Sequence, residues 1–200
     1  MPLGNSGVGK TSFITRFTEN KFQTTYLSTV GMDFGCKIIK IKNKKYKLLF
    51  YDTLGQERFK SLAPNLIKKS NGIIIMYDIT DKSSFDSIPE LIKNIREEKG
   101  NDFPAILVGN KIDLEEKRKI GEEQGKNLAE EYGMEFFEIS NKEGINIQEV
   151  ALAIVNKIFE NANNGNIIFE NDNISRILDN SYLSKFSNYD DDGSHISRCC

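Results

Sequence analysis

The sequence predicts an α/β fold in which a mostly parallel β-sheet is covered by helices on both faces. Two observations carry this prediction. Short apolar runs of strand length alternate with longer segments of helical spacing, which is typical of parallel sheets. Residues 4–11 (GNSGVGKT) also match the pattern G-x-x-x-x-G-K-[ST], a phosphate-binding loop that joins a strand to a helix.

The first elements after this loop are a helix and a hairpin. The helix covers residues 10–18 and opens at the loop itself. Residues 33–42 (DFGCKIIKIK) and 46–52 (YKLLFYD) have strand composition, and the turn at residues 42–45 joins them into a hairpin. We therefore expect one antiparallel strand at the edge of an otherwise parallel sheet.

The middle of the chain predicts two buried strands around a helix. Asn71-Gly72 precedes the apolar run 73–77, and Pro104 precedes the second run, 105–108. Between them, residues 84–98 have helical spacing. The apolar positions of that helix are Phe85, Ile88, Leu91, Ile92 and Ile95.

The last third of the domain predicts a helix over residues 121–132, a strand over 134–139 and an amphipathic helix over 145–160. The apolar face of the final helix carries Ile147, Val150, Ile154 and Ile158. These elements complete a domain that we expect to cover residues 1–161.

Beyond this domain, the composition predicts a disordered tail over residues 162–200. Residues 161–198 contain eight Asn and six Ser, and their six acidic residues outnumber three basic ones. The helical spacing of Ile174, Ile177, Leu178 and Tyr182 leaves open a short helix that binds a partner.

The overall composition excludes several classes of function. A formal net charge of −2 gives no indication of a nucleic-acid partner. We expect neither a membrane-spanning segment nor a signal peptide, since no apolar run is long enough. Three cysteines without framework spacing argue against a disulfide scaffold, and Cys36 is expected to be inert. His195 lies in the tail, so catalysis by histidine is not expected.

The phosphate-binding loop has a direct chemical interpretation. Its glycines let backbone N–H groups turn toward a polyphosphate, Lys10 can reach the outer phosphates, and Thr11 can offer its hydroxyl to Mg²⁺. The alternative interpretation is a glycine-rich turn before a helix.

A second motif follows the strand that ends at Asp52. An acidic side chain at that position can hold Mg²⁺ through water. Three residues later, Gly55 lets its N–H approach a terminal phosphate, and Gln56 can orient a water for in-line attack. Asp52 alone could equally be an ordinary turn residue.

A third motif, Asn110-Lys111-Ile112-Asp113, follows the strand that ends in Val108-Gly109. An ionised aspartate only accepts hydrogen bonds, so Asp113 suits a base edge with two adjacent donors, as guanine has. Adenine lacks this pair, and rejection through unmet polar groups reaches about 10⁴-fold. The alternative is an ordinary surface loop.

Five ordered motifs, from residue 4 to about residue 161, together resemble the small GTPases of the Ras superfamily. They are the phosphate-binding loop, Thr29 with the following VGMDF, DTLGQERF at residues 52–59, NKID at residues 110–113 and EISNK at residues 138–142. Within this superfamily the Rab branch is most similar. The segments that carry this similarity are STVGMDF at residues 28–34, QERF at 56–59, MYDIT at 76–80 and the closing Cys-Cys. The resemblance implies the three-layer fold of P-loop NTPases, GTP and GDP as ligands, and Mg²⁺ as cofactor.

The resemblance also implies a role for each matching residue. Lys10 and Gln56 are the implied catalytic residues, and Thr11, Thr29 and (through water) Asp52 the implied Mg²⁺ ligands. The implied nucleotide-binding residues are Asn5, Ser6, Gly7, Val8, Gly9, Lys10, Thr11, Ser12, Phe22, Thr29, Gly55, Asn110, Lys111, Asp113, Ser140, Asn141 and Lys142. In this assignment Phe22 packs edge-on against guanine, the stem of Lys111 covers the base, and a backbone N–H in residues 140–142 meets the guanine carbonyl.

The same resemblance implies partners and a location. The phosphate-binding loop and switch I contain no arginine, so hydrolysis should be slow without a GTPase-activating protein that supplies one. An exchange factor and effectors are also implied. Cys199 and Cys200 resemble a double geranylgeranyl signal, which implies an escort protein, a GDP-dissociation inhibitor, and anchoring to the cytoplasmic face of intracellular membranes with a cytosolic pool. The implied process is vesicle trafficking.

Three features depart from the family pattern. Only three residues precede Gly4, so we expect the central strand before the loop to be missing or nearly so, leaving a gap in the sheet, and the chain to start at an internal methionine. Leu54 stands where Ala is usual, which could slow hydrolysis. Residues 65–71 lack the paired tyrosines common in Rabs, so the identity of effectors and exchange factor stays open.

Two other functions remain as alternatives. A truncated pseudo-GTPase would engage partners as a binding module without cycling nucleotide, and the short N-terminus and Leu54 favour it. A P-loop ATPase or kinase is opposed by the N-K-x-D motif. The content of GDP or GTP in purified protein distinguishes a pseudo-GTPase from a GTPase. Competition between GTP and ATP for binding distinguishes an ATPase or kinase from a GTPase.

Overall fold

The computed structural model describes residues 1–22, 33–41, 44–52 and 63–163. It contains a four-stranded parallel sheet with the order β1-β4-β5-β6 and a separate antiparallel pair, β2-β3. The strands of the sheet are β1 (Pro2–Leu3), β4 (Ile73–Asp78), β5 (Ala105–Asn110) and β6 (Glu135–Ile139). The pair consists of β2 (Asp33–Ile41) and β3 (Lys44–Asp52).

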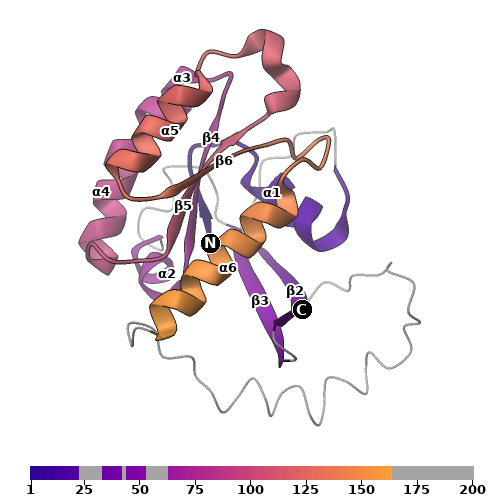
Figure 1. The fold of residues 1–200 in the computed structure, drawn as a ribbon, viewed down its shortest axis with the longest axis vertical. Coiled ribbons are helices and arrows are strands. Elements are labelled where there is room, and N and C mark those ends of the chain that lie inside the picture. Colours follow the sequence, from indigo (N-terminus) through magenta and orange to yellow (C-terminus); the bar gives the residue numbers. More distant parts are fainter. Residues whose placement is uncertain (23–32, 42–43, 53–62, 164–200) are drawn as a thin grey trace.

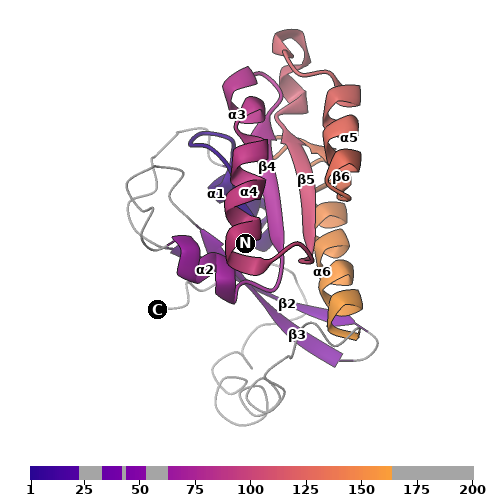
Figure 2. The same ribbon diagram turned by 90° about the vertical axis from the view of Figure 1, so that its left-hand side faces the viewer.

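Helices cover both faces of the parallel sheet (Figure 1). On one face lie α1 (Lys10–Glu19) and α6 (Ile147–Asn163); on the other lie α2 (Ala63–Lys69), α3 (Lys82–Asp86), α4 (Ile88–Lys99) and α5 (Glu122–Glu131). A 3₁₀ segment, η2 (Ile112–Lys117), follows β5. The view in Figure 2 shows the sheet between the layer of α4 and the layer of α6.

The core explains this three-layer arrangement. All six residues of β4 are buried, and their side chains alternate between two apolar clusters. Ile73, Ile75 and Tyr77 join the cluster under α4, while Ile74 and Met76 join the cluster under α1 and α6. Successive side chains of a strand point to opposite faces, so a continuous apolar run needs cover on both sides. The predicted α/β fold is confirmed.

The first strand, which was expected to be missing or nearly so, is two residues long. Pro2 and Leu3 form a two-residue strand in parallel register with Ile74 and Ile75, and the N–H of Ile74 donates to the carbonyl of Met1 at 2.9 Å. The chain therefore enters the phosphate-binding loop from a paired strand. Such a short strand offers few backbone groups for a second neighbour.

The predicted single sheet with an antiparallel edge strand is divided in the structure. Among the described residues, no ladder joins β3 to β1, and the hairpin forms a sheet of its own. Its pairing is antiparallel, as predicted, with Asp33 opposite Asp52 and Ile41 opposite Lys44, so β3 begins two residues earlier than the predicted strand. The hairpin still packs on the core, because Phe50 contacts Phe17 edge-on with ring centroids 5.4 Å apart.

The helix predicted over residues 84–98 is two helices. The side chain of Asp81 caps α3 by accepting from the N–H of Ser83 at 3.0 Å, and α3 ends at Asp86. Pro89 then lies in the first turn of α4, where its missing N–H costs nothing, whereas inside a continuous helix it would remove a hydrogen bond. Two further short elements, α2 and η2, were not predicted from the sequence.

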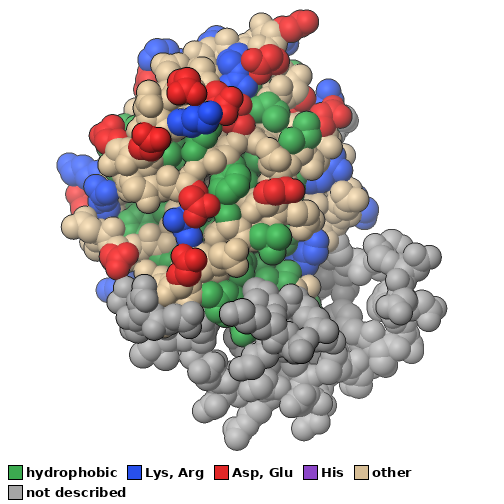
Figure 3. Space-filling view, in the orientation of Figure 1, with side chains coloured by type: hydrophobic (Ala, Val, Ile, Leu, Met, Phe, Trp, Pro, Cys, Tyr) green, Lys and Arg blue, Asp and Glu red, His purple; other side chains and the backbone are tan. Residues whose placement is uncertain are grey.

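The surface of the described part combines charged and apolar side chains. Acidic and basic groups are interspersed over the face shown in Figure 3, and Leu152 on α6 is 53% exposed. Among the described residues, no helix combines the length and hydropathy that crossing a membrane requires.

One buried tyrosine gives a testable prediction. Tyr77 is fully buried, its hydroxyl has no hydrogen-bond partner among the described residues, and burial raises the pKa of its phenol. We expect Tyr77→Phe to increase the free energy of unfolding in urea by about 1 kcal/mol, because it removes an unsatisfied polar group. The ring contact with Phe85, at 5.0 Å between centroids, stays in place. Tyr132→Phe, at a half-buried ring, is the control; a less stable Tyr77→Phe protein would contradict this reasoning.

Candidate functional site

The candidate site lies where strands of the parallel sheet end. The phosphate-binding loop follows β1, Asn110 ends β5, and Ser140 follows β6. Ligands of open α/β sheets bind at these carboxyl ends, outside the sheet. Residues from distant parts of the sequence therefore meet at one edge.

The loop at residues 4–11 needs its glycines for close approach. Gly4 has a φ of +147°, and a Cβ there would collide with the carbonyl of Met76. Gly9 caps α1 in a left-handed conformation, and a Cβ there would collide with the amide of Asn110 and lie 2.7 Å from that of Asn141. Val8 between them buries its side chain in the core, so only its backbone is available to a ligand.

Lys10 is the first residue of α1 and is 6% exposed. Its Nζ donates to the carbonyls of Gly4 and Asn5 at 2.9 and 2.7 Å, so the ammonium group lies under the loop. Burial lowers the pKa of Lys10 to about 8, against the opposite effect of the nearby Asp52 carboxylate. A polyphosphate in the loop would supply the negative charge that favours the ammonium form.

Thr11 and Asp52 lie next to each other, as a shared Mg²⁺ site requires. The Thr11 hydroxyl donates to Oδ2 of Asp52 at 2.7 Å, and Asp52 is 3% exposed at the end of β3. A hydroxyl and a carboxylate are the hard oxygen donors that Mg²⁺ prefers, with phosphate oxygens and waters filling its other positions. The two side chains therefore fit Mg²⁺.

Two asparagines join the phosphate-binding loop to the predicted base-reading segments. Nδ2 of Asn110 donates to the carbonyl of Val8 at 2.7 Å, and Nδ2 of Asn141 donates to the carbonyl of Gly9 at 2.9 Å. The backbone N–H of Asn141 also lies 3.3 Å from Oδ1 of Asn110. Three loops thus form one connected framework.

The predicted base-reading carboxylate is held by the loop after β6. Oδ1 of Asp113 accepts from the hydroxyl of Ser140 at 2.6 Å, and Nζ of Lys142 lies 3.9 Å from Oδ2. The Asp113 side chain is 10% exposed. Its remaining acceptor sites can take the two adjacent donors of a guanine edge.

The structure adds Asp78 to the residues that the sequence analysis singled out. Asp78 ends β4, is 6% exposed, and pairs with Nζ of Lys111 at 2.6 Å. Lys111 itself has a left-handed backbone with a φ of +74°. The position of Asp78, directly after the buried run 73–77, was the available signal.

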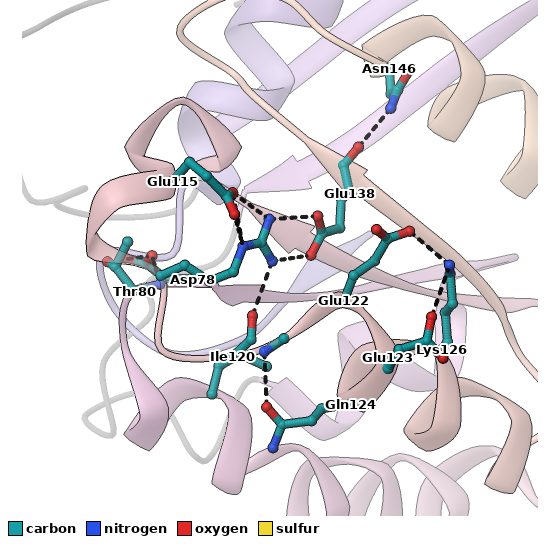
Figure 4. A network of polar contacts seen from close by, with 12 residues as sticks. Asp78, Thr80, Glu115, Ile120, Glu122, Glu123, Gln124, Lys126, Glu138 and Asn146 are labelled. Carbon is teal, nitrogen blue, oxygen red and sulfur yellow. Dashed lines mark hydrogen bonds and ion pairs between the residues drawn. The ribbon is translucent and has the colours of Figure 1, made fainter.

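A salt-bridge network ties the two base-reading segments together (Figure 4). Arg118, just after η2, donates to both carboxylate oxygens of Glu138 at 2.6 and 2.8 Å and to Glu115 at 2.8 Å. Hydrogen bonding to Glu138, and then to Glu115, raises the pKa of this guanidinium. Glu138 immediately precedes the Ile139-Ser140 segment, so the network limits relative movement of η2 and the end of β6.

The structure describes some of the other predicted site residues, and the rest lie outside its described part. Phe22 is half-buried, and its ring lies 6.0 Å from the guanidinium carbon of Arg16. The loop residues Asn5, Ser6 and Gly7 range from half-buried to exposed, and Ser12 is half-buried in the first turn of α1. The predicted residues that lie outside the described part are Thr29, Leu54, Gly55, Gln56, Cys199 and Cys200.

Comparison with known proteins places the chain in a family. The model of the Ras family matches residues 1–160. Ras-related protein Rab-8 of Diplobatis ommata is 41% identical over 161 residues, covering 80% of this chain and 77% of that protein. Ras-related protein Rab-13 of Bos taurus is 44% identical over 156 residues, covering 78% and 77%. Ras-related protein Rab-8B of Homo sapiens is 40% identical over 161 residues, covering 80% and 78%. The chain therefore belongs to the Ras family, as a Rab-like small GTPase that hydrolyses GTP.

Proposed function

We propose that the loops at the ends of β1, β3, β5 and β6 form one site that takes a Mg²⁺–guanine nucleotide across its whole length. The observation that carries this proposal is the pair of amide contacts, Asn110 to Val8 and Asn141 to Gly9, which join the phosphate and base ends. At the phosphate end, Lys10 neutralises charge on the outer phosphates, and the loop N–H groups surround them. At the base end, Asp113 accepts from guanine and the stem of Lys111 covers the ring.

The chemistry assigned to this site is in-line attack of water on the γ-phosphate. Gln56 orients the water, Gly55 offers its N–H to the γ-phosphate, and Lys10 stabilises developing charge. Thr11, Thr29 and (through water) Asp52 would hold Mg²⁺, which would withdraw charge from the phosphates. Leu54, beside Gly55, is proposed to slow this step.

The proposed cellular role is a switch in vesicle trafficking. Thr29 and Gly55 would respond to the presence of the γ-phosphate, so effectors would distinguish the GTP form from the GDP form. A GTPase-activating protein and an exchange factor would set the rates. The chain after α6, which ends at Asn163, would be a tail whose Cys199 and Cys200 carry two prenyl groups, since two lipid chains give stable anchoring where one does not. An escort protein and a GDP-dissociation inhibitor would then account for a cytosolic pool.

The test starts from the nucleotide that the protein carries. We expect the purified full chain to retain stoichiometric GDP or GTP, to exchange it for GTP but not for a hundredfold excess of ATP, and to hydrolyse bound GTP slowly in a single turnover. Protein without nucleotide that still folds would support the pseudo-GTPase alternative. Effective competition by ATP would support the ATPase alternative.

A further inference from the structure

Arg16 contacts two parts of the chain that are proposed to surround guanine, the segment 140–142 and Phe22, although no motif includes it. It lies in the last turn of α1, the helix that begins at Lys10. Its Nε donates to the carbonyl of Asn141 at 2.7 Å, and a terminal nitrogen donates to the carbonyl of Lys142. Its guanidinium carbon also lies 6.0 Å from the centre of the Phe22 ring, within the range of a cation–π contact.

The third nitrogen of the Arg16 guanidinium, Nη1, also forms a hydrogen bond. Nη1 donates to the carbonyl of Asn20, the residue that caps α1 in a left-handed conformation at its C-terminus. The planar fork of an arginine can serve several carbonyls at fixed angles, which a lysine ammonium cannot. Arg16 thus links the end of α1, the segment 140–142 and Phe22.

The segment 140–142 is held from the other end of α1 too. Nδ2 of Asn141 donates to the carbonyl of Gly9, which also accepts from the N–H of Phe13 at 2.9 Å. Asn141 is 3% exposed, and its Oδ1 has no hydrogen-bond partner among the described residues. The side-chain amide of Asn141 therefore forms one hydrogen bond. The two charged hydrogen bonds from Arg16 hold the segment 140–142 more strongly than this neutral one.

We propose that Arg16 is a positioning residue that holds the segment 140–142 and Phe22 in place around guanine and thereby sets how long the nucleotide stays bound. This inference rests on the proposed function, in which a backbone N–H of that segment meets the guanine carbonyl. Arg16 itself touches no part of the nucleotide in this proposal. It acts through the carbonyls of Asn141 and Lys142.

The first measurement is the release of a fluorescent GDP analogue from the full chain in excess unlabelled GDP. Loss of the charged hydrogen bonds should make release from Arg16→Ala about ten- to a hundredfold faster, and Arg16→Lys should lie between it and the parent. Arg96→Ala, on α4 at a guanidinium that stacks on Tyr132, is the matched control and should release GDP at the parental rate. Titration of active sites and thermal unfolding check that each variant is folded.

The second measurement separates positioning from a general loss of stability. In 6-thio-GDP only the guanine carbonyl oxygen is replaced, by sulfur, which is a weaker acceptor. We expect the parent to bind 6-thio-GDP about tenfold more weakly than GDP, and Arg16→Ala to bind the two within about twofold of each other. A variant that is merely destabilised would keep the parental ratio.

The outcomes distinguish this inference from the proposed function. If the unsubstituted protein (the parent) binds no guanine nucleotide, both the proposed function and the role of Arg16 are overturned. A parent that binds GDP, with unchanged release or an unchanged sulfur penalty in Arg16→Ala, overturns only the role of Arg16. A parent without any sulfur penalty also overturns it, because no contact to the carbonyl would then exist to be positioned.

Discussion

Replacing Asp113 by asparagine is expected to lower the affinity for GDP by about a hundredfold or more. The carboxylate offers only acceptors, and one of its oxygens already accepts from Ser140 at 2.6 Å. An asparagine amide has one acceptor oxygen where the carboxylate has two, so it cannot accept from the Ser140 hydroxyl and from both guanine donors, and its N–H₂ group would face a guanine donor or take the place of an accepting oxygen. Because the side chain is only 10% exposed, water cannot repair the mismatch.

Equilibrium titration with GDP, alongside ADP, measures this effect. The matched control is Glu116→Gln, which makes the same change from carboxylate to amide at an exposed position of η2. Glu116 has no assigned part in binding or positioning the nucleotide, so GDP affinity should stay within about twofold of the parent. Folded Asp113→Asn protein with parental affinity for GDP would show that this carboxylate does not read the base.

Replacing Lys10 by methionine is expected to lower the affinity for GDP by about a hundred- to a thousandfold. The side chain is almost fully buried, and its ammonium lies among carbonyls of the phosphate-binding loop. Methionine keeps the apolar stem but removes the ammonium charge that the proposed function places beside the outer phosphates. The carbonyls of Gly4 and Asn5 also lose their donor, so the loop should be less ordered before nucleotide binds.

Isothermal titration with GDP at fixed Mg²⁺ measures this loss, and circular dichroism checks the fold. Lys82→Met on α3 is the control, because Lys82 is 67% exposed and pairs with Asp86 one turn later. Its expected effect on GDP affinity is less than about twofold. The assignment of Lys10 to the phosphate end fails if Lys10→Met and Lys82→Met bind GDP equally well.

Much of the fold could be predicted because its signals are local. The apolar run 73–77 predicts a strand with cover on both faces, and the structure divides its side chains between two apolar clusters. The hairpin was predicted from composition and a turn, and its two strands pair in the expected antiparallel direction. The break before α4 was missed because the spacing of Phe85, Ile88 and Ile92 suits one helix, while capping by Asp81 and the position of Pro89 decide otherwise.

The motif residues of the candidate site could be predicted from the sequence, whereas the residues that support them could not. The residue types and spacing of the loop at 4–11 and of residues 110–113 carry chemical meaning by themselves, because each needs a particular backbone turn or donor pattern. Arg16 and the Arg118–Glu138 pair have no such local signal, and the position of Asp78 after the run 73–77 does not indicate its partner, Lys111. Each acts through a partner that is close only in the folded chain.

The sequence by itself determined the order of the longer helices and strands and the chemistry that each motif can supply, since both depend on neighbouring residues. Tertiary structure alone decided that two residues suffice for β1 to pair with β4, while the β2–β3 hairpin stays separate. It also decided which loops meet. The contact of Asn110 with Val8 spans 102 residues, that of Arg16 with Asn141 spans 125, and that of Asn141 with Gly9 spans 132. Such contacts form because parallel strands bring their carboxyl ends to one edge of a sheet, and no local pattern records which side chains will face each other there.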